Sequence, residues 1–203
     1  MRSSRAVKLA GLVLLLLLVV TGCGSASHKY NYKKEFDPRQ HEYVIGAGDS
    51  LAINVWQNAD LSTGALVRPD GTITMPLVGD IKVAGRTPSQ VRDEITKRIS
   101  QYVKAEAAIV TVAVSAVASY RFTVTGNVNN PGSFQSQFYV SIADALAMAG
   151  GPTRFADTDN IEVVRQGGDG KMRRIPVSYD DIQTRKRPEA NLILVAGDTV
   201  YVP

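Results

Sequence analysis

The chain's only cysteine, Cys23, most constrains what this sequence can fold into. The residues that follow it contain no second thiol, so they can form neither a disulfide nor a cysteine-ligated metal site. A hydrophobic core therefore has to hold the fold together. Hydrophobic residues make up 44% of the chain, which is enough to build such a core.

The residues before Cys23 have the layout of an export signal. Three basic residues lie near the start: Arg2, Arg5 and Lys8. An apolar run over residues 9–20 follows, and a helix of that length spans roughly 18 Å, well short of the ~30 Å hydrocarbon core of a bilayer. We therefore interpret residues 1–22 as a signal peptide that is removed. An ordinary signal with an incidental cysteine is the alternative, but a cysteine directly after Thr21-Gly22 favours a lipoprotein signal.

Lipidation at Cys23 predicts a durable membrane anchor. One acyl chain binds a membrane only marginally, whereas two or three chains hold a protein on it, since each buried CH₂ contributes ~0.8 kcal/mol. Residue 24 is glycine and not the aspartate that commonly retains lipoproteins at the inner membrane. We therefore expect a protein anchored in the outer membrane and facing the periplasm.

The charge of the exported protein argues against a nucleic-acid partner. The whole chain has a net charge of +4, but losing the three basic signal residues leaves 20 Lys and Arg against 19 Asp and Glu. The mature protein is then nearly neutral at +1, and it lacks the clustered basic excess that nucleic-acid binders usually show.

We expect two small domains after a tether. Residues 23–42 are polar and without periodicity, which is typical of a lipidated flexible tether. Folded structure is predicted from Tyr43, with a first domain over residues 43–119 and a second over residues 120–203.

The first domain is predicted to contain strands and one helix. Strands are expected at residues 43–45, 51–56 and 109–117, and a hairpin at residues 66–68 and 72–75 around Pro69-Asp70-Gly71. Thr87, Pro88 and Gln90 form the start signal of a helix. Its apolar stripe is Val91, Ile95, Ile99 and Tyr102.

The second domain repeats this mixture of strands and one helix. Strands are expected at residues 121–125, 161–165, 174–177 and 199–202, with a turn region at residues 126–132. A helix should begin at Ser141, be capped by Asp144 and end at Gly150-Gly151. The fold class is therefore α+β, with a β-grasp-like second domain. A faint echo links residues 45–51 to residues 195–200, and in both copies the aspartate, Asp49 or Asp198, is expected to cap a turn.

Taken in order and spacing, these motifs resemble the outer-membrane polysaccharide export lipoproteins. Residues 43–49, 68–73, 75–79 and 83–87 are similar to successive elements of that family's export domain. Residues 125–132, 147–151 and 196–203 are similar to its soluble-ligand-binding β-grasp (SLBB) domain.

The resemblance implies a passive role in a periplasmic ring through which a capsular or exopolysaccharide polymer leaves the cell. The implied partners are the polymer, an inner-membrane polysaccharide copolymerase and further copies of this chain in a ring homo-oligomer. Larger family members continue into a helix that crosses the outer membrane. No such segment precedes the end of this sequence at Pro203, so a separate outer-membrane pore protein is also expected.

The resemblance assigns a set of turn and loop residues to structure and assembly, and none to catalysis. These residues are Gly48, Asp49, Pro69, Asp70, Gly71, Pro76, Gly79, Gly126, Pro131, Gly132, Gly150, Gly151, Gly197 and Asp198. The basic residues Lys171, Arg173, Arg174, Arg185, Lys186 and Arg187 form either a surface that attracts an acidic partner or a solvated face. Trp56 and Tyr120 are candidates for stacking on sugar rings, although Trp56 ends an apolar strand, which favours a place in the core.

Two other classes of function remain as alternatives. An enzyme is disfavoured because the two histidines, His28 and His41, lie in or beside the tether and have no metal-ligand spacing; no cofactor or metal is expected. A non-conducting outer-membrane lipoprotein that binds envelope glycan or a neighbouring envelope protein would share the anchor, tether and domains. A closed ring distinguishes the conduit from this second alternative.

Overall fold

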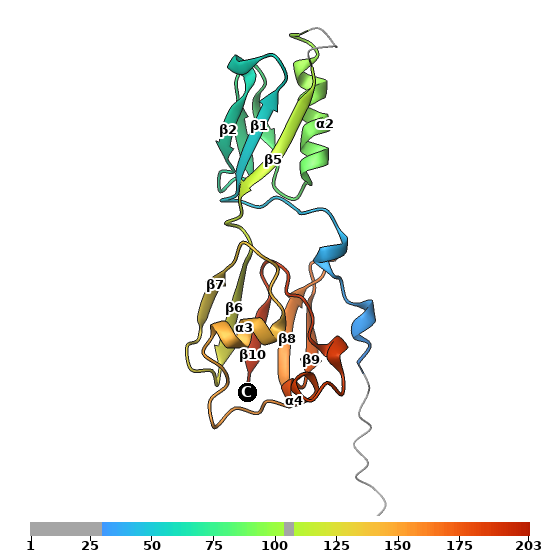
Figure 1. Cartoon of the computed structure of the whole chain (residues 1–203), viewed down its shortest axis with the longest axis vertical. Coiled ribbons are helices and arrows are strands. Elements are labelled where there is room, and N and C mark those ends of the chain that lie inside the picture. The colour runs from blue at the N-terminus through green and yellow to red at the C-terminus, as the bar shows by residue number, and fades with distance from the viewer. Residues whose placement is uncertain (1–29, 104–107) are drawn as a thin grey trace, which may run out of the picture. The chain divides into compact units, whose positions relative to one another are not determined.

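The structure is a computed structural model that describes residues 30–103 and 108–203, of which Asn31–Pro203 form one compact unit. Cys23 and the predicted signal peptide lie outside the described residues. Figure 1 shows the strands of the N-terminal region (residues 43–119), which form two sheets, and those of the C-terminal region (residues 120–203), which form a third.

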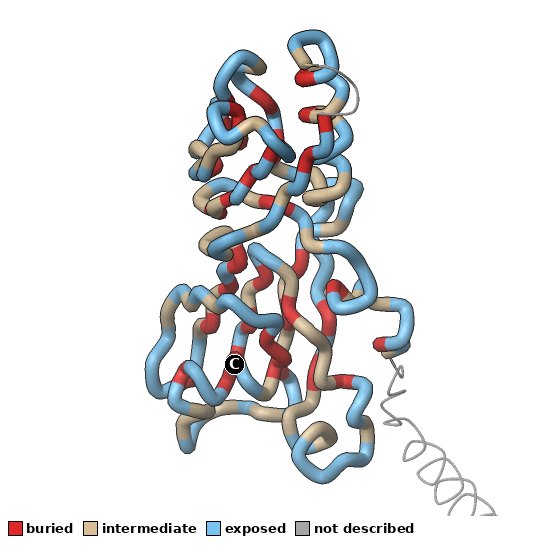
Figure 2. Tube along the Cα trace, turned by 45° about the horizontal axis from the view of Figure 1, so that its top comes forward, coloured by how far each residue is buried: buried red, intermediate tan, exposed pale blue. Residues whose placement is uncertain are grey.

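A three-stranded antiparallel sheet forms the centre of the N-terminal region. Its order is β2-β1-β5, with β1 at Ser50–Val55, β2 at Thr63–Leu66 and β5 at Val110–Ala116. The 3-10 helix η3 (Ala59–Leu61) joins β1 to β2. Buried and exposed residues alternate along β1, because successive side chains of a strand point to opposite faces (Figure 2).

A hairpin and a helix complete this region. β3 (Thr72–Met75) pairs antiparallel with β4 (Gly79–Lys82), and α2 (Pro88–Ile99) packs against β5. Their apolar side chains share one core, which comprises Ile45, Leu51, Ile53, Val55, Leu61, Val67, Ile73, Met75, Ile81, Val83, Val91, Ile95, Ile99, Ala108 and Val110.

Helix α2 begins at the predicted capping box. The Thr87 hydroxyl accepts a hydrogen bond from the Gln90 amide (3.3 Å), and the Gln90 side chain accepts one from the Thr87 amide (3.0 Å). The helix buries the predicted stripe at Val91, Ile95 and Ile99. Tyr102 is exposed beyond the helix end, so its predicted place in the stripe is wrong.

The predicted hairpin between residues 66–68 and 72–75 is also wrong, although its turn is present. The Gly71 amide donates to the Arg68 carbonyl (2.7 Å), which closes the turn. Beyond it, β2 pairs with β1 and β3 pairs with β4, so the strands on either side enter different sheets. β4 was not predicted, because Ile81 is its one buried residue and a single apolar position gives no alternating pattern.

Two further strand predictions change at the ends of β1. Residues 43–45 belong to no named strand; Ile45 instead exchanges backbone hydrogen bonds with Gly85 and Arg86. Trp56 follows the last residue of β1 and is 59% exposed, so the expectation that it is a core residue is wrong.

The C-terminal region contains a five-stranded mixed sheet in the order β7-β6-β10-β8-β9. The strands are β6 (Arg121–Gly126), β7 (Gly132–Gln135), β8 (Ile161–Gln166), β9 (Met172–Val177) and β10 (Thr199–Val202). β10 runs parallel to β6, and the other pairs are antiparallel. The last strand in sequence is thus the middle strand of the sheet.

Helix α3 (Ile142–Met148) crosses one face of this sheet (Figure 1). Ser141 and Asp144 form the predicted capping box at its start. Ile142, Ala145 and Leu146 are buried, and a short helix α4 (Tyr179–Gln183) follows β9. The sheets and packed helices confirm the predicted α+β class.

The segment before Tyr43 contributes packed side chains from Tyr32 onward. It forms two short 3-10 helices, η1 (Tyr32–Lys34) and η2 (Pro38–Gln40). Tyr32 is only 6% exposed, and its hydroxyl donates to the Pro176 carbonyl on β9 (2.7 Å). Ordered structure therefore begins before Tyr43, inside the range predicted as a tether.

Replacing the cap of α2 should destabilise the fold. Thr87→Ala removes the hydroxyl that receives the Gln90 amide, and we expect the free energy of unfolding to fall by about 1 kcal/mol in urea denaturation. The matched control is Thr96→Ala inside the same helix, where alanine is the better helix former. An equal loss of stability in both variants would contradict the capping role.

Candidate functional site

The Asp49 turn is the most densely bonded of the predicted motif positions. The Asp49 side chain is fully buried. One carboxylate oxygen accepts hydrogen bonds from the amides of Ala118 and Ser119 (both 2.8 Å). The other accepts from the Gly46 amide (2.9 Å), the Tyr43 hydroxyl (2.7 Å) and the Ser119 hydroxyl (2.9 Å). Asp49 thus connects the start of the N-terminal region to its end.

These contacts keep Asp49 ionised. Burial by itself would raise its pKa, but the donated hydrogen bonds outweigh burial and the pKa lies below the ordinary value. Burial raises the pKa of Tyr43, whose hydroxyl therefore keeps its proton and donates to the carboxylate. Glycine is required at residue 46, because a Cβ there would lie 2.4 Å from the Ser119 side chain.

A second turn of the same kind surrounds Asp198. Its carboxylate accepts from the Val195 amide (2.8 Å), three residues earlier, as Asp49 accepts from Gly46. The sequence echo therefore corresponds to a repeated turn in which the aspartate accepts a hydrogen bond from the amide three residues before it. The other partner differs, because Arg165 contacts the buried Asp198 carboxylate through Nε (3.0 Å) and Nη2 (2.7 Å).

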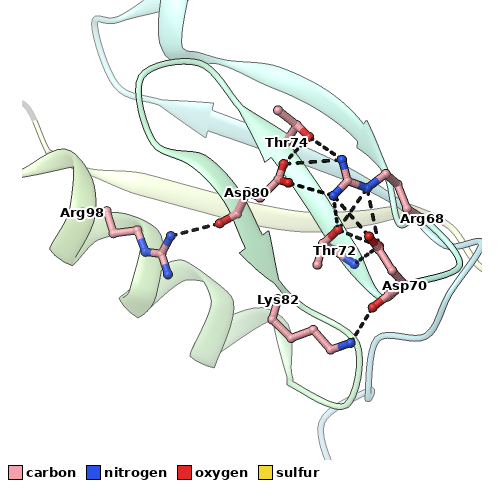
Figure 3. Close-up of polar contacts among 7 residues, drawn as sticks. All are labelled: Arg68, Asp70, Thr72, Thr74, Asp80, Lys82 and Arg98. Carbon is pink, nitrogen blue, oxygen red and sulfur yellow. Dashed lines mark hydrogen bonds and ion pairs between the residues drawn. The ribbon is translucent and has the colours of Figure 1, made fainter.

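Around Pro69-Asp70-Gly71, polar side chains form an exposed network, which we call the Arg68 cluster (Figure 3). It comprises Arg68, Asp70, Thr72, Thr74 and Asp80. The Arg68 guanidinium lies 2.9 Å from Asp80 and 3.3 Å from Asp70, and it donates to the Thr74 hydroxyl at 3.0 Å. The cluster connects the turn to both strands of the β3–β4 hairpin.

The carboxylates of the Arg68 cluster are engaged within the chain. The Thr72 hydroxyl and amide donate to Asp70 (2.6 and 3.0 Å), and these bonds lower its pKa to about 2. Hydrogen bonding from Arg68 lowers the pKa of Asp80. Asp70 and Asp80 therefore stabilise the turn and hairpin.

Two predicted motifs, residues 125–132 and residues 147–151, meet at the end of the C-terminal sheet. The Asn129 side chain donates to the carbonyls of Gly150 (2.8 Å) and Gly151 (3.2 Å), and the Asn129 amide also donates to Gly151 (3.1 Å). Glycine is required at residue 126, because φ is +92° and a Cβ would lie 2.0 Å from the Val202 carbonyl oxygen. Pro131 is exposed between this contact and Gly132, the first residue of β7.

The remaining motif residues lie in turns. Pro76 and Gly79 flank the β3–β4 turn, in which Leu77 is exposed and has the unusual φ of +61° for a residue other than glycine. The predicted glycines with positive φ are Gly48, Gly71, Gly79, Gly126, Gly150, Gly151 and Gly197.

Two adjoining apolar cavities of about 510 and 330 Å³ share three tyrosines: Tyr43, Tyr120 and Tyr139. Phe36 and Ala196 also line the larger cavity, and Phe138 the smaller one. The Tyr139 ring meets the Tyr120 ring edge-on at 5.6 Å. The pattern of short apolar runs gave no sign of this aromatic group, because its members come from three separate segments.

The comparison with known families agrees with this arrangement. Residues 37–115 match the polysaccharide biosynthesis/export protein family, and residues 121–176 match the SLBB domain. The chain carries a polysaccharide export domain and an SLBB domain. The export domain contains β1–β5 and α2, while the matched SLBB residues stop within β9, before β10 completes the same sheet.

Three similar proteins are named for polysaccharide export or polysialic acid transport. The chain is 32% identical to the EPS I polysaccharide export outer membrane protein EpsA of Ralstonia nicotianae, over 79% of this chain and 47% of that protein. It is 30% identical to the capsule polysaccharide export outer membrane protein CtrA of Neisseria meningitidis (77% and 43%). It is 29% identical to the polysialic acid transport protein KpsD of Escherichia coli (79% and 28%). The chain thus spans less than half the length of each of these relatives.

The SLBB domain's basic residues are mostly engaged with acidic neighbours. Arg174 pairs with Glu162 (2.5 Å) and Lys186 with Asp180 (3.3 Å). Arg187 lies 3.6 Å from Glu189, and its guanidinium stacks over the Tyr32 ring. This arrangement fits the solvated-face alternative.

Of the two aromatic candidates for stacking on sugar rings, Tyr120 is buried and Trp56 is exposed. Tyr120, at the entrance to the SLBB domain, is buried, and its hydroxyl donates to the Leu194 carbonyl (2.9 Å). Trp56 of the export domain is exposed. His41 is also exposed and stacks on Phe36, with ring centroids 4.6 Å apart.

Among residues 30–103 and 108–203, no group of three or more His, Cys, Asp or Glu side chains is arranged to hold a metal ion. In the same part of the chain, no helix has the length and apolar character needed to cross a membrane.

Asp49 of the export domain should make stability depend on pH. Its folded-state pKa lies below the unfolded value of ~3.9, so its contribution is present above about pH 4 and is lost as pH falls through the folded pKa. We expect Asp49→Asn to lower the free energy of unfolding by about 2 kcal/mol at pH 7 and by less at pH 3, measured by urea denaturation.

The control for this prediction is Asp93→Asn, because the Asp93 carboxylate is exposed on α2. That variant should stay within about 0.5 kcal/mol of the wild type at pH 7. An Asp49→Asn variant as stable as the control would show that the buried carboxylate is dispensable.

Proposed function

We propose that this chain is a lipoprotein component of a conduit that exports capsular or extracellular polysaccharide across the cell envelope. The observation that carries the proposal is the succession of an export domain and an SLBB domain over most of the described residues. Relatives that cover more than three quarters of the chain are named for polysaccharide export or polysialic acid transport. A lipid anchor at Cys23 would hold the protein at the outer membrane, facing the periplasm.

The proposed role is passive. The sequence contains no Gly-x-x-x-x-Gly-Lys-Ser/Thr loop that would bind a nucleoside triphosphate, so the energy for export would come from elsewhere. The buried carboxylate of Asp49 and those of the Arg68 cluster are bonded within the chain. These bonds fit a structural role for the motif residues. A polysaccharide polymer and an inner-membrane copolymerase are the partners that such a conduit requires.

Copies of the chain would pack head to tail into a ring, because heterologous contacts close when the rotation between neighbours divides a full turn. The β3–β4 hairpin and the SLBB strands are the proposed contact elements. Leu77 at the hairpin tip and Leu66 on the edge strand β2 are exposed, and β7 forms one edge of the SLBB sheet. Apolar side chains and strand edges of this kind favour contact with a neighbouring copy.

The assembly state tests the conduit directly. We expect the detergent-extracted, acylated protein to form closed rings, alone or with its copolymerase, when examined by light scattering and negative-stain imaging. A stable monomer under both conditions would favour the alternative of a non-conducting lipoprotein that binds envelope glycan or a neighbouring protein.

The anchor is tested by Cys23→Ser. Because the cysteine precedes all described residues, we expect a protein that folds normally but is released from membranes, and a loss of most surface polysaccharide in cells that depend on it. The measurement pairs membrane fractionation with quantitation of surface polymer. Undiminished polymer with a soluble variant would contradict the anchoring step.

A further inference from the structure

The segment that leads to the proposed lipid anchor contacts the SLBB sheet at β9. Tyr32 lies against β9, where its hydroxyl donates to the Pro176 carbonyl (2.7 Å) and the Arg187 guanidinium lies 4.8 Å from its ring centre. Pro176 pairs with Glu162, which pairs with Tyr201 across the sheet. This row is one residue from the last β6–β10 pair, Gly126 and Val202. We call this side of the sheet the Val202 end.

From the Val202 end the segment runs along the sheet toward its other end. Three residues after Tyr32, the side chain of Glu35 lies 3.6 Å from Arg165, the fifth residue of β8. Arg165 also approaches the Phe36 carbonyl at 3.5 Å. Because the chain enters at the Val202 end and proceeds away from it, the residues before Tyr32 connect to the sheet at the Val202 end.

The remaining chain is too short to take the anchor far away. Tyr32 lies nine positions after Cys23 in the sequence, and an extended chain spans at most about 3.3–3.6 Å per residue. A lipid on Cys23 therefore lies within roughly 30 Å of the Tyr32 contact, whatever path the intervening residues take.

The Val202 end presents apolar side chains to solvent. The loop before β8 lies there, since Pro152 bridges to Val128 and the Asp157 amide donates to the Pro203 carbonyl (2.8 Å). Phe155 in this loop is 72% exposed, with the Arg154 guanidinium 4.6 Å above its ring. Met148, at the end of α3, is 41% exposed.

The opposite end of the sheet has covalent connections to the export domain. Tyr120 precedes the first residue of β6, and the segment from Phe36 to Tyr43 leads away from the Arg165 contact. The chain enters the sheet at the Val202 end and the export domain follows from the opposite end, so the Val202 end is the side open to a bilayer that holds the anchor.

We propose that the Arg154–Phe155 loop contacts the phospholipid bilayer that holds the anchor. The exposed phenyl ring would enter the boundary between headgroups and acyl chains, and the guanidinium above it would pair with lipid phosphate. The two aspartates of the loop are engaged elsewhere, because Asp157 accepts a hydrogen bond from the Asn160 side chain and Asp159 accepts one from the Ser178 hydroxyl. Arg154 is therefore available to a lipid phosphate. The proposal rests on the proposed lipidation of Cys23.

Tryptophan fluorescence tests this contact in the full acylated protein. Trp56 is exposed and is replaced in a Trp56→Phe background, into which either Phe155→Trp or Phe138→Trp is introduced. Phe138 is the matched control: it is 80% exposed in the same domain, three residues after Gln135, which pairs with Arg121 at the opposite end of β6. Six strand residues, roughly 20 Å, separate the two ends.

The proteins are reconstituted into phosphatidylethanolamine–phosphatidylglycerol vesicles that contain brominated phosphatidylcholine. We expect bromolipid to quench the F155W protein at least twofold more strongly than the F138W protein, with a blue-shifted emission for F155W alone. Flotation with the vesicles but equal quenching would overturn the membrane contact and leave the anchor standing. Failure to float would overturn the lipid anchor, and this proposal with it.

Discussion

The buried carboxylate of Asp49 is the interaction on which the export domain depends. It collects amides and hydroxyls from two segments about seventy residues apart, so the beginning and end of the domain meet at one residue. A buried charge is unfavourable unless it is well bonded, and here five donors satisfy it. The close approach of Gly46 to Ser119 is a consequence of this convergence.

The SLBB domain also has a buried carboxylate, and a different donor satisfies it. Asp198 occupies an equivalent turn, but its main partner is the guanidinium of Arg165, which also approaches Glu35. A buried ion pair depends on both partners remaining in place, because removal of one leaves the other charged and unpaired. Through Glu35, the segment before the export domain therefore helps to neutralise the buried Arg165 of the SLBB domain.

Local signals in the sequence predicted helices α2 and α3 well and strand pairing poorly. The capping boxes at Thr87 and Ser141 involve residues three apart, so both helix starts could be read directly. The Pro69-Asp70-Gly71 turn was equally readable, yet a turn sequence does not specify which strands pair beyond it. The contacts of Tyr32 with Pro176 and of Glu35 with Arg165 join residues more than a hundred positions apart, and no periodicity reports such contacts.

The contact of Tyr32 with β9 also affects where a further strand can join the SLBB sheet. β9 is an edge strand, and an edge offers free backbone groups to which another strand can add. Pro176 has no amide hydrogen, and its carbonyl already receives the Tyr32 hydroxyl. Strand addition is thus hindered at β9, so the two edges of the sheet differ. A new strand, whether from a partner or from a misfolded neighbour, joins more readily at β7.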